Sequence, residues 1–139
     1  MRNKLLSVLF AALFSALLLA TPFAAGADQK PRDLAMETYR FMDAAQGKSG
    51  GFLSKDASKA DYFTQFASPA KALVKKWPQP LTEEYYDYAD CYFALDLLIK
   101  YGDKVIADKS QKDPELAVRK THFGNSFREC QRDLRKPPQ

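Results

Sequence analysis

The sequence has few of the residues that most often build metal and redox centres: one histidine and two cysteines among 139 residues. The cysteines, Cys91 and Cys130, lie far apart. The chain therefore lacks the Cys-x-x-Cys pair typical of redox-active thiols and the Cys-x-x-Cys-His motif that attaches haem covalently. If the cysteines are bridged, His122 is left as a single ligand, and one ligand cannot form a zinc site of nitrogen and sulfur atoms. We expect no bound metal and no resident cofactor.

A set of residues typical of an enzyme is also missing. The tripeptide Gly47-Lys48-Ser49 resembles the end of a phosphate-binding loop, but Met42 stands where that pattern needs its first glycine. A helix, not a strand, is expected before it. His122, Ser126 and Glu129 are close along one expected helix, a spacing that does not aim three side chains at one substrate atom. We predict that the protein is not an enzyme.

One long apolar run is present, and it lies at the N-terminus. Arg2 and Lys4 precede an uncharged segment, residues 5–20, that is rich in leucine, alanine and phenylalanine. Ala25-Gly26-Ala27 then supplies the small residues that a signal peptidase reads. The alternative is a retained membrane anchor, but the run is short for a full span. We predict that residues 1–27 are a cleavable signal peptide and that the protein is periplasmic or secreted.

The remaining segment, residues 28–139, has the length of one domain. The whole chain carries a net charge of +4. Removing the leader takes away Arg2 and Lys4 and no acidic residue, which leaves a net charge of about +2. This charge is too small to favour nucleic acid as a partner. Because no second long apolar stretch occurs, we expect no stable membrane association after cleavage.

The cysteine pair suggests one covalent link within the domain. In an oxidising compartment two cysteines most simply form one disulfide, and we predict a bridge between Cys91 and Cys130. Closing a loop of about 40 residues stabilises a fold by about 4 kcal/mol on the chain-entropy model. A redox-active pair is the alternative, which the wide spacing disfavours.

Apolar residues recur at helical spacing, and no run alternates as a strand would. The expected helices are residues 31–46, a segment from about 56 or 58 to 77 with a break or kink at 68–69, residues 82–101, and residues 113–136. Either close packing or a break in the last helix would explain Gly124, since glycine weakens a helix interior. These elements predict an all-α fold, a small irregular bundle of four to five helices with one interhelical disulfide.

The third expected helix is the most apolar and should lie at the centre of the bundle. At 100° per residue Glu83, Asp87 and Asp90 fall on one narrow strip of its surface. Asp96 is the one polar residue within the apolar arc, and a carboxylate there needs a partner. We favour an intramolecular one, for which Lys100, four residues on, is the simplest candidate.

Charge and tyrosine are concentrated in one segment. Residues 83–96 contain five acidic residues and four tyrosines but no basic residue. One explanation is attraction to the basic last helix or simple solvation. The other is a docking surface, because tyrosine is common in interfaces and acidic side chains suit a basic target. The candidate contact residues are Glu83, Glu84, Tyr86, Asp87 and Asp90, together with Lys48 and Ser49 of the glycine-rich loop.

A small exported domain without recognisable catalytic residues most often works by binding. This inference is an analogy with proteins of the same general class. We expect a periplasmic protein-binding module, an immunity protein or inhibitor that neutralises a secreted toxin or a cell-wall enzyme. Two alternatives stay open. One is a small-ligand carrier, such as a bundle that holds haem non-covalently between Met36 or Met42 and His122. The other is an envelope adaptor.

Overall fold

The computed structural model describes residues 30–47, 53, 58–107 and 112–137. All regular structure in these segments is helical, which confirms the predicted all-α class. The predicted signal peptide at residues 1–27 and the loop residues Lys48 and Ser49 lie outside the described segments. No helix within them combines the length and the apolar character needed to cross a bilayer.

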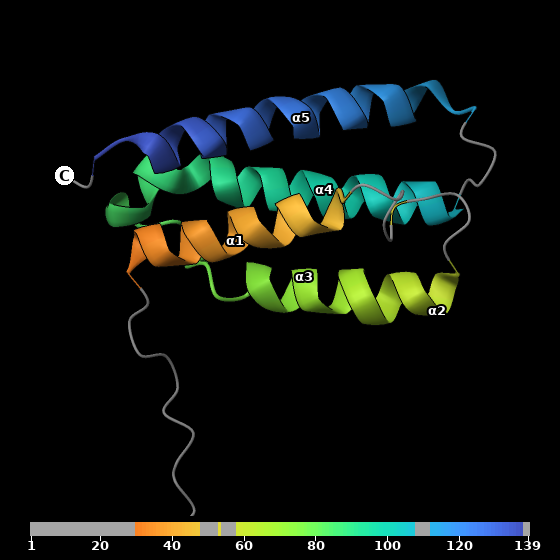
Figure 1. Ribbon diagram of the computed structural model, residues 1–139, viewed down its shortest axis with the longest axis horizontal. Coiled ribbons are helices and arrows are strands. Elements are labelled where there is room, and N and C mark those ends of the chain that lie inside the picture. The colour runs from red at the N-terminus through yellow and green to blue at the C-terminus, as the bar shows by residue number, and fades with distance from the viewer. Residues whose placement is uncertain (1–29, 48–52, 54–57, 108–111, 138–139) are drawn as a thin grey trace, which may run out of the picture.

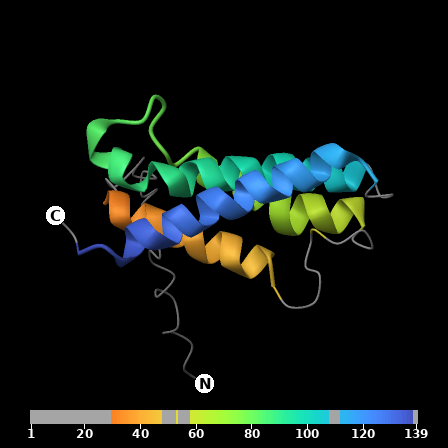
Figure 2. The same ribbon diagram turned by 90° about the horizontal axis from the view of Figure 1, so that it is seen from above.

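Four helical rods form the bundle, and successive rods run in opposite directions (Figures 1 and 2). The elements in chain order are α1 (Pro31–Ala45), α2 (Lys59–Asp61), the π-helical η1 (Tyr62–Ala67), α3 (Ser68–Val74), the 3-10 helix η2 (Glu83–Tyr88), α4 (Ala89–Ala107) and α5 (Pro114–Arg135). The short elements α2, η1 and α3 together make one rod. Helix α4 is central, as predicted, and packs against α1, α3 and α5.

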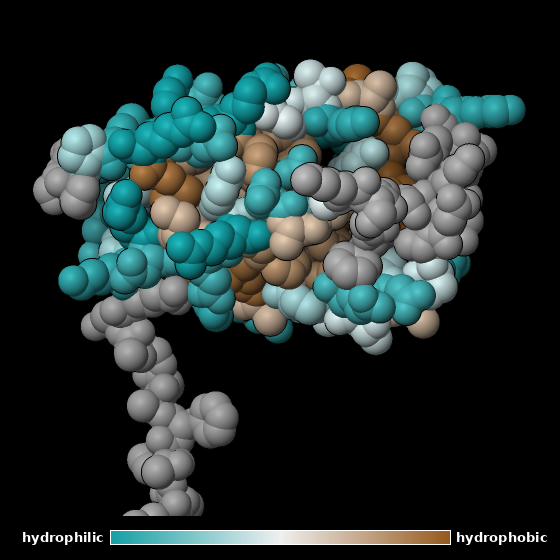
Figure 3. All heavy atoms as spheres, in the orientation of Figure 1, coloured by the Kyte–Doolittle hydropathy of each residue, from teal (hydrophilic) through white to brown (hydrophobic). Residues whose placement is uncertain are grey.

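The core lies between these rods and is rich in large side chains. Trp77, Tyr62 and Phe66 are among its most deeply buried members. The indole Nε1 of Trp77 donates a hydrogen bond to Oγ1 of Thr38, at 3.2 Å, so neither polar atom is buried without a partner. On the face seen in Figure 1, apolar atoms remain visible over and between α1 and α5, while polar side chains cover the edges (Figure 3).

A new helix, α3, begins at Ser68 with Pro69 in its first turn, as expected, but it continues the second rod directly. The rod begins at Ser58, whose hydroxyl accepts a hydrogen bond from the backbone N–H of Asp61, at 3.0 Å. Pro69 has no N–H to offer the preceding turn, and its ring crowds that turn. The chain there widens to the π-helical pattern, in which the N–H of Ser68 bonds to the carbonyl of Phe63. The rod therefore passes the proline without a break.

The third predicted helix differs from the structure at both ends. Residues 83–88 form the 3-10 helix η2, and the side chain of Thr82 makes no capping hydrogen bond. The helix also continues beyond Gly102, where it was expected to stop, as far as Ala107. A Cβ atom at Gly102 would lie 2.7 Å from the hydroxyl of Tyr62 and 2.8 Å from Cδ2 of Leu53. This glycine serves close packing between two rods and does not end a helix.

The last predicted helix is confirmed at its start, where the Asp113 carboxylate accepts the backbone N–H of Glu115, at 2.9 Å. Helix α5 continues unbroken through Gly124. A Cβ atom there would find no neighbour closer than Nη1 of Arg128, at 3.9 Å, so neither predicted explanation of this glycine holds.

The predicted disulfide is present and joins α4 to α5. Cys91 and Cys130 are bonded to each other, and their Cα atoms are 4.6 Å apart. Both residues are fully buried, so the bridge forms part of the core. At the other end of the same helix pair, Nζ of Lys104 lies 2.7 Å from a carboxylate oxygen of Asp113. The two long helices are thus tied near both ends.

Candidate functional site

Helix η2 lies at one end of the bundle, where it contacts α1 and α5 (Figures 1 and 2). Its inner side is held by Tyr85, whose ring meets the buried Trp77 edge-on with centroids 5.8 Å apart. Tyr88 also packs against the core. A 3-10 helix has three residues per turn, so Tyr85 and Tyr88 lie on the same face. Because this face points inward, the other residues of η2 face outward.

The outward residues are Glu83, Glu84, Tyr86 and Asp87, and all four are exposed. We call them the acidic-tyrosine surface. At three residues per turn, Glu83 lies in line with Tyr86, and Glu84 lies in line with Asp87. Tyr86 is 62 % exposed, which makes it the most exposed large hydrophobic side chain of the described residues. Four of the seven residues predicted to contact a partner therefore lie together on one short helix.

The three carboxylates of this surface are not neutralised by neighbouring bases. Within the described segments none of Glu83, Glu84 and Asp87 forms an ion pair. Glu84 accepts a long hydrogen bond, 3.5 Å, from the hydroxyl of Thr82. Three negative charges thus share one short helix with a solvent-facing aromatic ring. Such a group is suited to meet positive charge on a partner.

Asp90 lies apart from this group, because it faces α5. Burial raises the pKa of its carboxyl, and the nearby carboxylates of Asp133 and Glu129 raise it further, while Arg132 and Lys136 oppose them. The predicted strip of Glu83, Asp87 and Asp90 assumed 100° per residue, which does not hold across the 3-10 turns of η2. Asp90 therefore packs between α4 and α5 and is set apart from the acidic-tyrosine surface.

A narrow crevice joins the acidic-tyrosine surface to the end of α5. It holds about 40 Å³ and is lined by Asp87, Tyr88, Asp133, Lys136 and Pro137. Asp133 is buried, and Nζ of Lys136 pairs with its carboxylate at 2.7 Å. This ion pair lies within the end of α5 and does not join the acidic segment to that helix. The expected attraction between the two segments is seen at Asp90, where the charges of Arg132 and Lys136 oppose the rise in pKa that burial causes.

One exposed aromatic residue beside this surface was counted with the apolar central helix by sequence reasoning. Phe93 is 48 % exposed, and its ring meets that of Tyr92 edge-on with centroids 5.4 Å apart. Its position relative to Tyr86 could not be predicted from an α-helical spacing, because the chain between them passes from the 3-10 turns of η2 into α4.

The residues considered for other functions are dispersed. Met42 is fully buried in the core, Met36 is partly buried, and His122 is exposed on α5, so the structure does not bring the suggested haem ligands into one cavity. No group of three or more His, Cys, Asp or Glu side chains able to hold a metal ion occurs in the part of the chain that the structure describes. Asp96 pairs with Lys100 at 2.6 Å, the intramolecular partner that was expected.

Comparisons of the chain with protein-family models, with curated proteins and with solved structures find no match. The function must therefore be argued from the arrangement of these side chains.

Proposed function

We propose that the protein is a binding module of the cell envelope whose acidic-tyrosine surface docks onto a basic site of a partner protein. In this proposal it acts as an immunity protein or inhibitor, and its partner is a secreted toxin or a cell-wall enzyme. The observation that carries the proposal is Tyr86, which is 62 % exposed on an anchored helix. Three carboxylates accompany it there, and none of them forms an ion pair with another described residue. Tyrosine at the centre of an interface commonly supplies a large share of binding energy.

The anchoring of η2 supports this proposal in energetic terms. A contact group on a rigid element loses little conformational freedom on binding, so more of its interaction energy appears as affinity. Tyr85 fixes η2 against Trp77 from the inside, and α4 continues directly from its last turn. The surface is therefore ordered before a partner arrives.

The negative charge of the acidic-tyrosine surface supports a target with a basic site. Enzymes that act on anionic polymers need positive potential in their clefts, and an acidic surface is attracted to such a cleft over several ångströms. A disulfide between α4 and α5 supports an oxidising compartment, where such bridges persist. An exported inhibitor would meet its target there.

The experiment is affinity capture from envelope extract, followed by an assay of the captured protein. Tyr86→Ala should reduce capture at least about tenfold, as the loss of a central interface tyrosine does. Phe63→Ala is the matched control, because Phe63 is an exposed aromatic residue on η1, 48 % exposed and away from η2. An equal loss in both variants would show that the acidic-tyrosine surface is not the docking site.

The assay of the captured partner separates inhibitor from adaptor. If the partner is an enzyme or toxin, adding the protein at equimolar amount should suppress its activity, and the Tyr86→Ala variant should not. A partner that stays fully active in the complex would contradict the inhibitor proposal and favour an envelope adaptor.

A further inference from the structure

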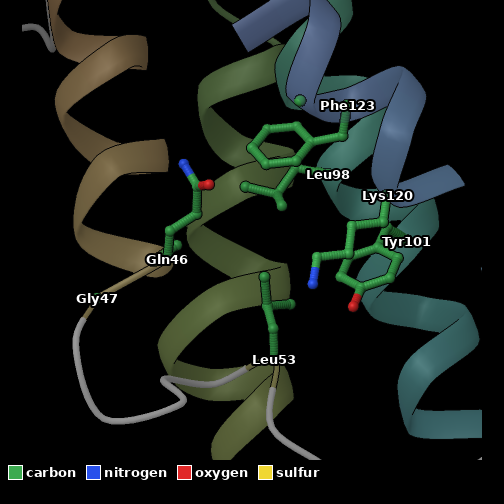
Figure 4. A pocket seen from close by; sticks show the side chains of 9 residues that line it. Gln46, Gly47, Leu53, Leu98, Tyr101, Lys120 and Phe123 are labelled. Atoms are coloured by element: carbon green, nitrogen blue, oxygen red, sulfur yellow. The ribbon is translucent and has the colours of Figure 1, made fainter. Parts of the chain in front are cut away.

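A second concave site lies toward the other end of the bundle, where α1 ends between α4 and α5. The hollow holds about 460 Å³, which is within the range of sites for small organic molecules. Its floor is apolar: Leu98 is fully buried, and Phe123 and Ala45 are nearly so. Leu53 closes one side (Figure 4). An apolar ligand would find packing partners on several sides.

Two polar groups on one wall point into this hollow. The ammonium group of Lys120 and the hydroxyl of Tyr101 lie beside each other in Figure 4, one from α5 and the other from α4. Within the described residues Lys120 has no ion pair and the Tyr101 hydroxyl has no hydrogen bond. Burial raises the pKa of the Tyr101 phenol, which keeps it protonated. Both groups are hydrogen-bond donors, so they suit an acceptor of negative charge.

Gln46 lines the opposite wall, at the end of α1 (Figure 4). Among the described residues its side-chain amide makes one long hydrogen bond, 3.4 Å, to the carbonyl of Met42. The side-chain carbonyl oxygen can accept a further hydrogen bond. The polar groups of the hollow therefore stand at its rim, above the apolar floor.

The glycine in the middle of α5 also lines this hollow. Gly124 weakens a 22-residue helix, and no neighbour packs close enough to require it, since the nearest atom to a Cβ there is 3.9 Å away. Because glycine has no side chain, this position of α5 leaves space in the wall of the hollow. Neither close packing nor a helix break requires this glycine, and its position keeps the hollow open.

We propose that this hollow binds a small carboxylic acid with an apolar body, such as a medium-chain fatty acid. The apolar body lies on Leu98 and Phe123. The carboxylate accepts hydrogen bonds from the Lys120 ammonium and the Tyr101 hydroxyl. This site is separate from the acidic-tyrosine surface and does not rest on the proposed docking function.

Calorimetric titration of the purified protein, produced from the full chain, tests this assignment with octanoate, octan-1-ol and octylammonium. The three probes share one tail and differ in head group. Octanoate should bind at one per chain and at least about tenfold more tightly than octan-1-ol, because a charge-assisted contact is strong at a partly enclosed site. Octylammonium should bind most weakly. Absence of saturable octanoate binding, or equal binding of all three probes, would overturn the proposal.

Two variants locate the site. Lys120→Met keeps most of the apolar stem and should lower octanoate affinity to that of octan-1-ol; Lys71→Met, at an exposed position of α3, is the matched control and should change nothing. Gly124→Leu should abolish binding of octanoate by filling the hollow. Leucine favours a helix more than glycine does, so this variant should unfold at the same or a higher temperature. Undiminished octanoate binding in Gly124→Leu, or in Lys120→Met, would show that the hollow is not the site.

Discussion

The ring of Tyr85 meets the indole of Trp77 edge-on, with their centroids 5.8 Å apart. Trp77 is buried and donates a hydrogen bond from Nε1 to Thr38 of α1. Trp77 lies in the loop before η2, so these two contacts connect η2 to α1. Neighbouring tyrosines of η2 therefore have different roles: Tyr85 anchors the helix, and Tyr86 faces solvent.

This division predicts opposite effects of two adjacent substitutions. Tyr85→Ala should lower the free energy of unfolding by about 2 kcal/mol, because it removes a packed ring and its contact with Trp77. Tyr86→Ala should change that free energy by less than about 0.5 kcal/mol, since the side chain is exposed. Urea unfolding of both variants measures the difference. Equal losses of stability would show that Tyr85 does not anchor η2.

The two glycines inside the long helices predict a second contrast. Gly102→Ala should destabilise the protein by about 1–3 kcal/mol, because the new Cβ would lie 2.7 Å from the Tyr62 hydroxyl and force the packing apart. Gly124→Ala should stabilise it by about 1 kcal/mol, the gain in helix propensity where space is open. Thermal unfolding of the pair decides the matter. A stabilising Gly102→Ala would mean that α4 and the second rod do not approach as closely as described.

Much of the secondary structure could be predicted because its causes are local. Ser58 and Asp113 cap helices through their own side chains, and Cys91 and Cys130 could pair only with each other. Gly102 was misread because glycine serves both to end helices and to let two helices approach. Which of these applies depends on Tyr62, 40 residues earlier in the chain and brought close by packing alone.

The acidic-tyrosine surface and the hollow depend on tertiary packing more than the helices do, so less of them could be predicted from the sequence. Residues 83–88 carry the acidic first turn of an ordinary α-helix, yet the contact of Tyr85 with Trp77 accompanies a 3-10 geometry that changes which residues share a face. The hollow beside Gly124 could not be predicted at all. Lys120 and Tyr101 come from different helices, and no spacing along the chain indicates that they meet.

Asp90 predicts how stability depends on pH. Its pKa is raised in the folded protein, chiefly by burial, so folding disfavours its ionised form. The contribution of this group is therefore most favourable below the pKa of the unfolded chain and is lost as the pH rises through the folded pKa. Asp90→Asn should stabilise the protein at pH 7, with a difference that shrinks toward about pH 3. Urea midpoints at the two pH values test this; a variant less stable at pH 7 would contradict it.

The disulfide predicts a large loss of stability on removal. Cys91 and Cys130 are separated by 39 positions, and a loop of this length is worth about 4 kcal/mol on the chain-entropy model. The double variant Cys91→Ala/Cys130→Ala should lose about that amount, measured by urea unfolding against the oxidised protein. Because both residues are fully buried, dithiothreitol should reduce the bridge slowly in native buffer and faster in urea. A double variant as stable as the parent would show that the bridge does not support the fold.

If the carboxylates of η2 attract a basic partner, their charge sets how fast the two proteins associate. The association rate constant with the captured partner measures this effect. We would compare the parent with Glu83→Gln/Glu84→Gln/Asp87→Asn, which removes the charge and keeps the shape, at low and high salt. The parent should associate at least about tenfold faster than the variant at low salt, and the two rates should converge at high salt. Equal rates at low salt, or a parent rate that does not fall with added salt, would show that these carboxylates do not attract the partner.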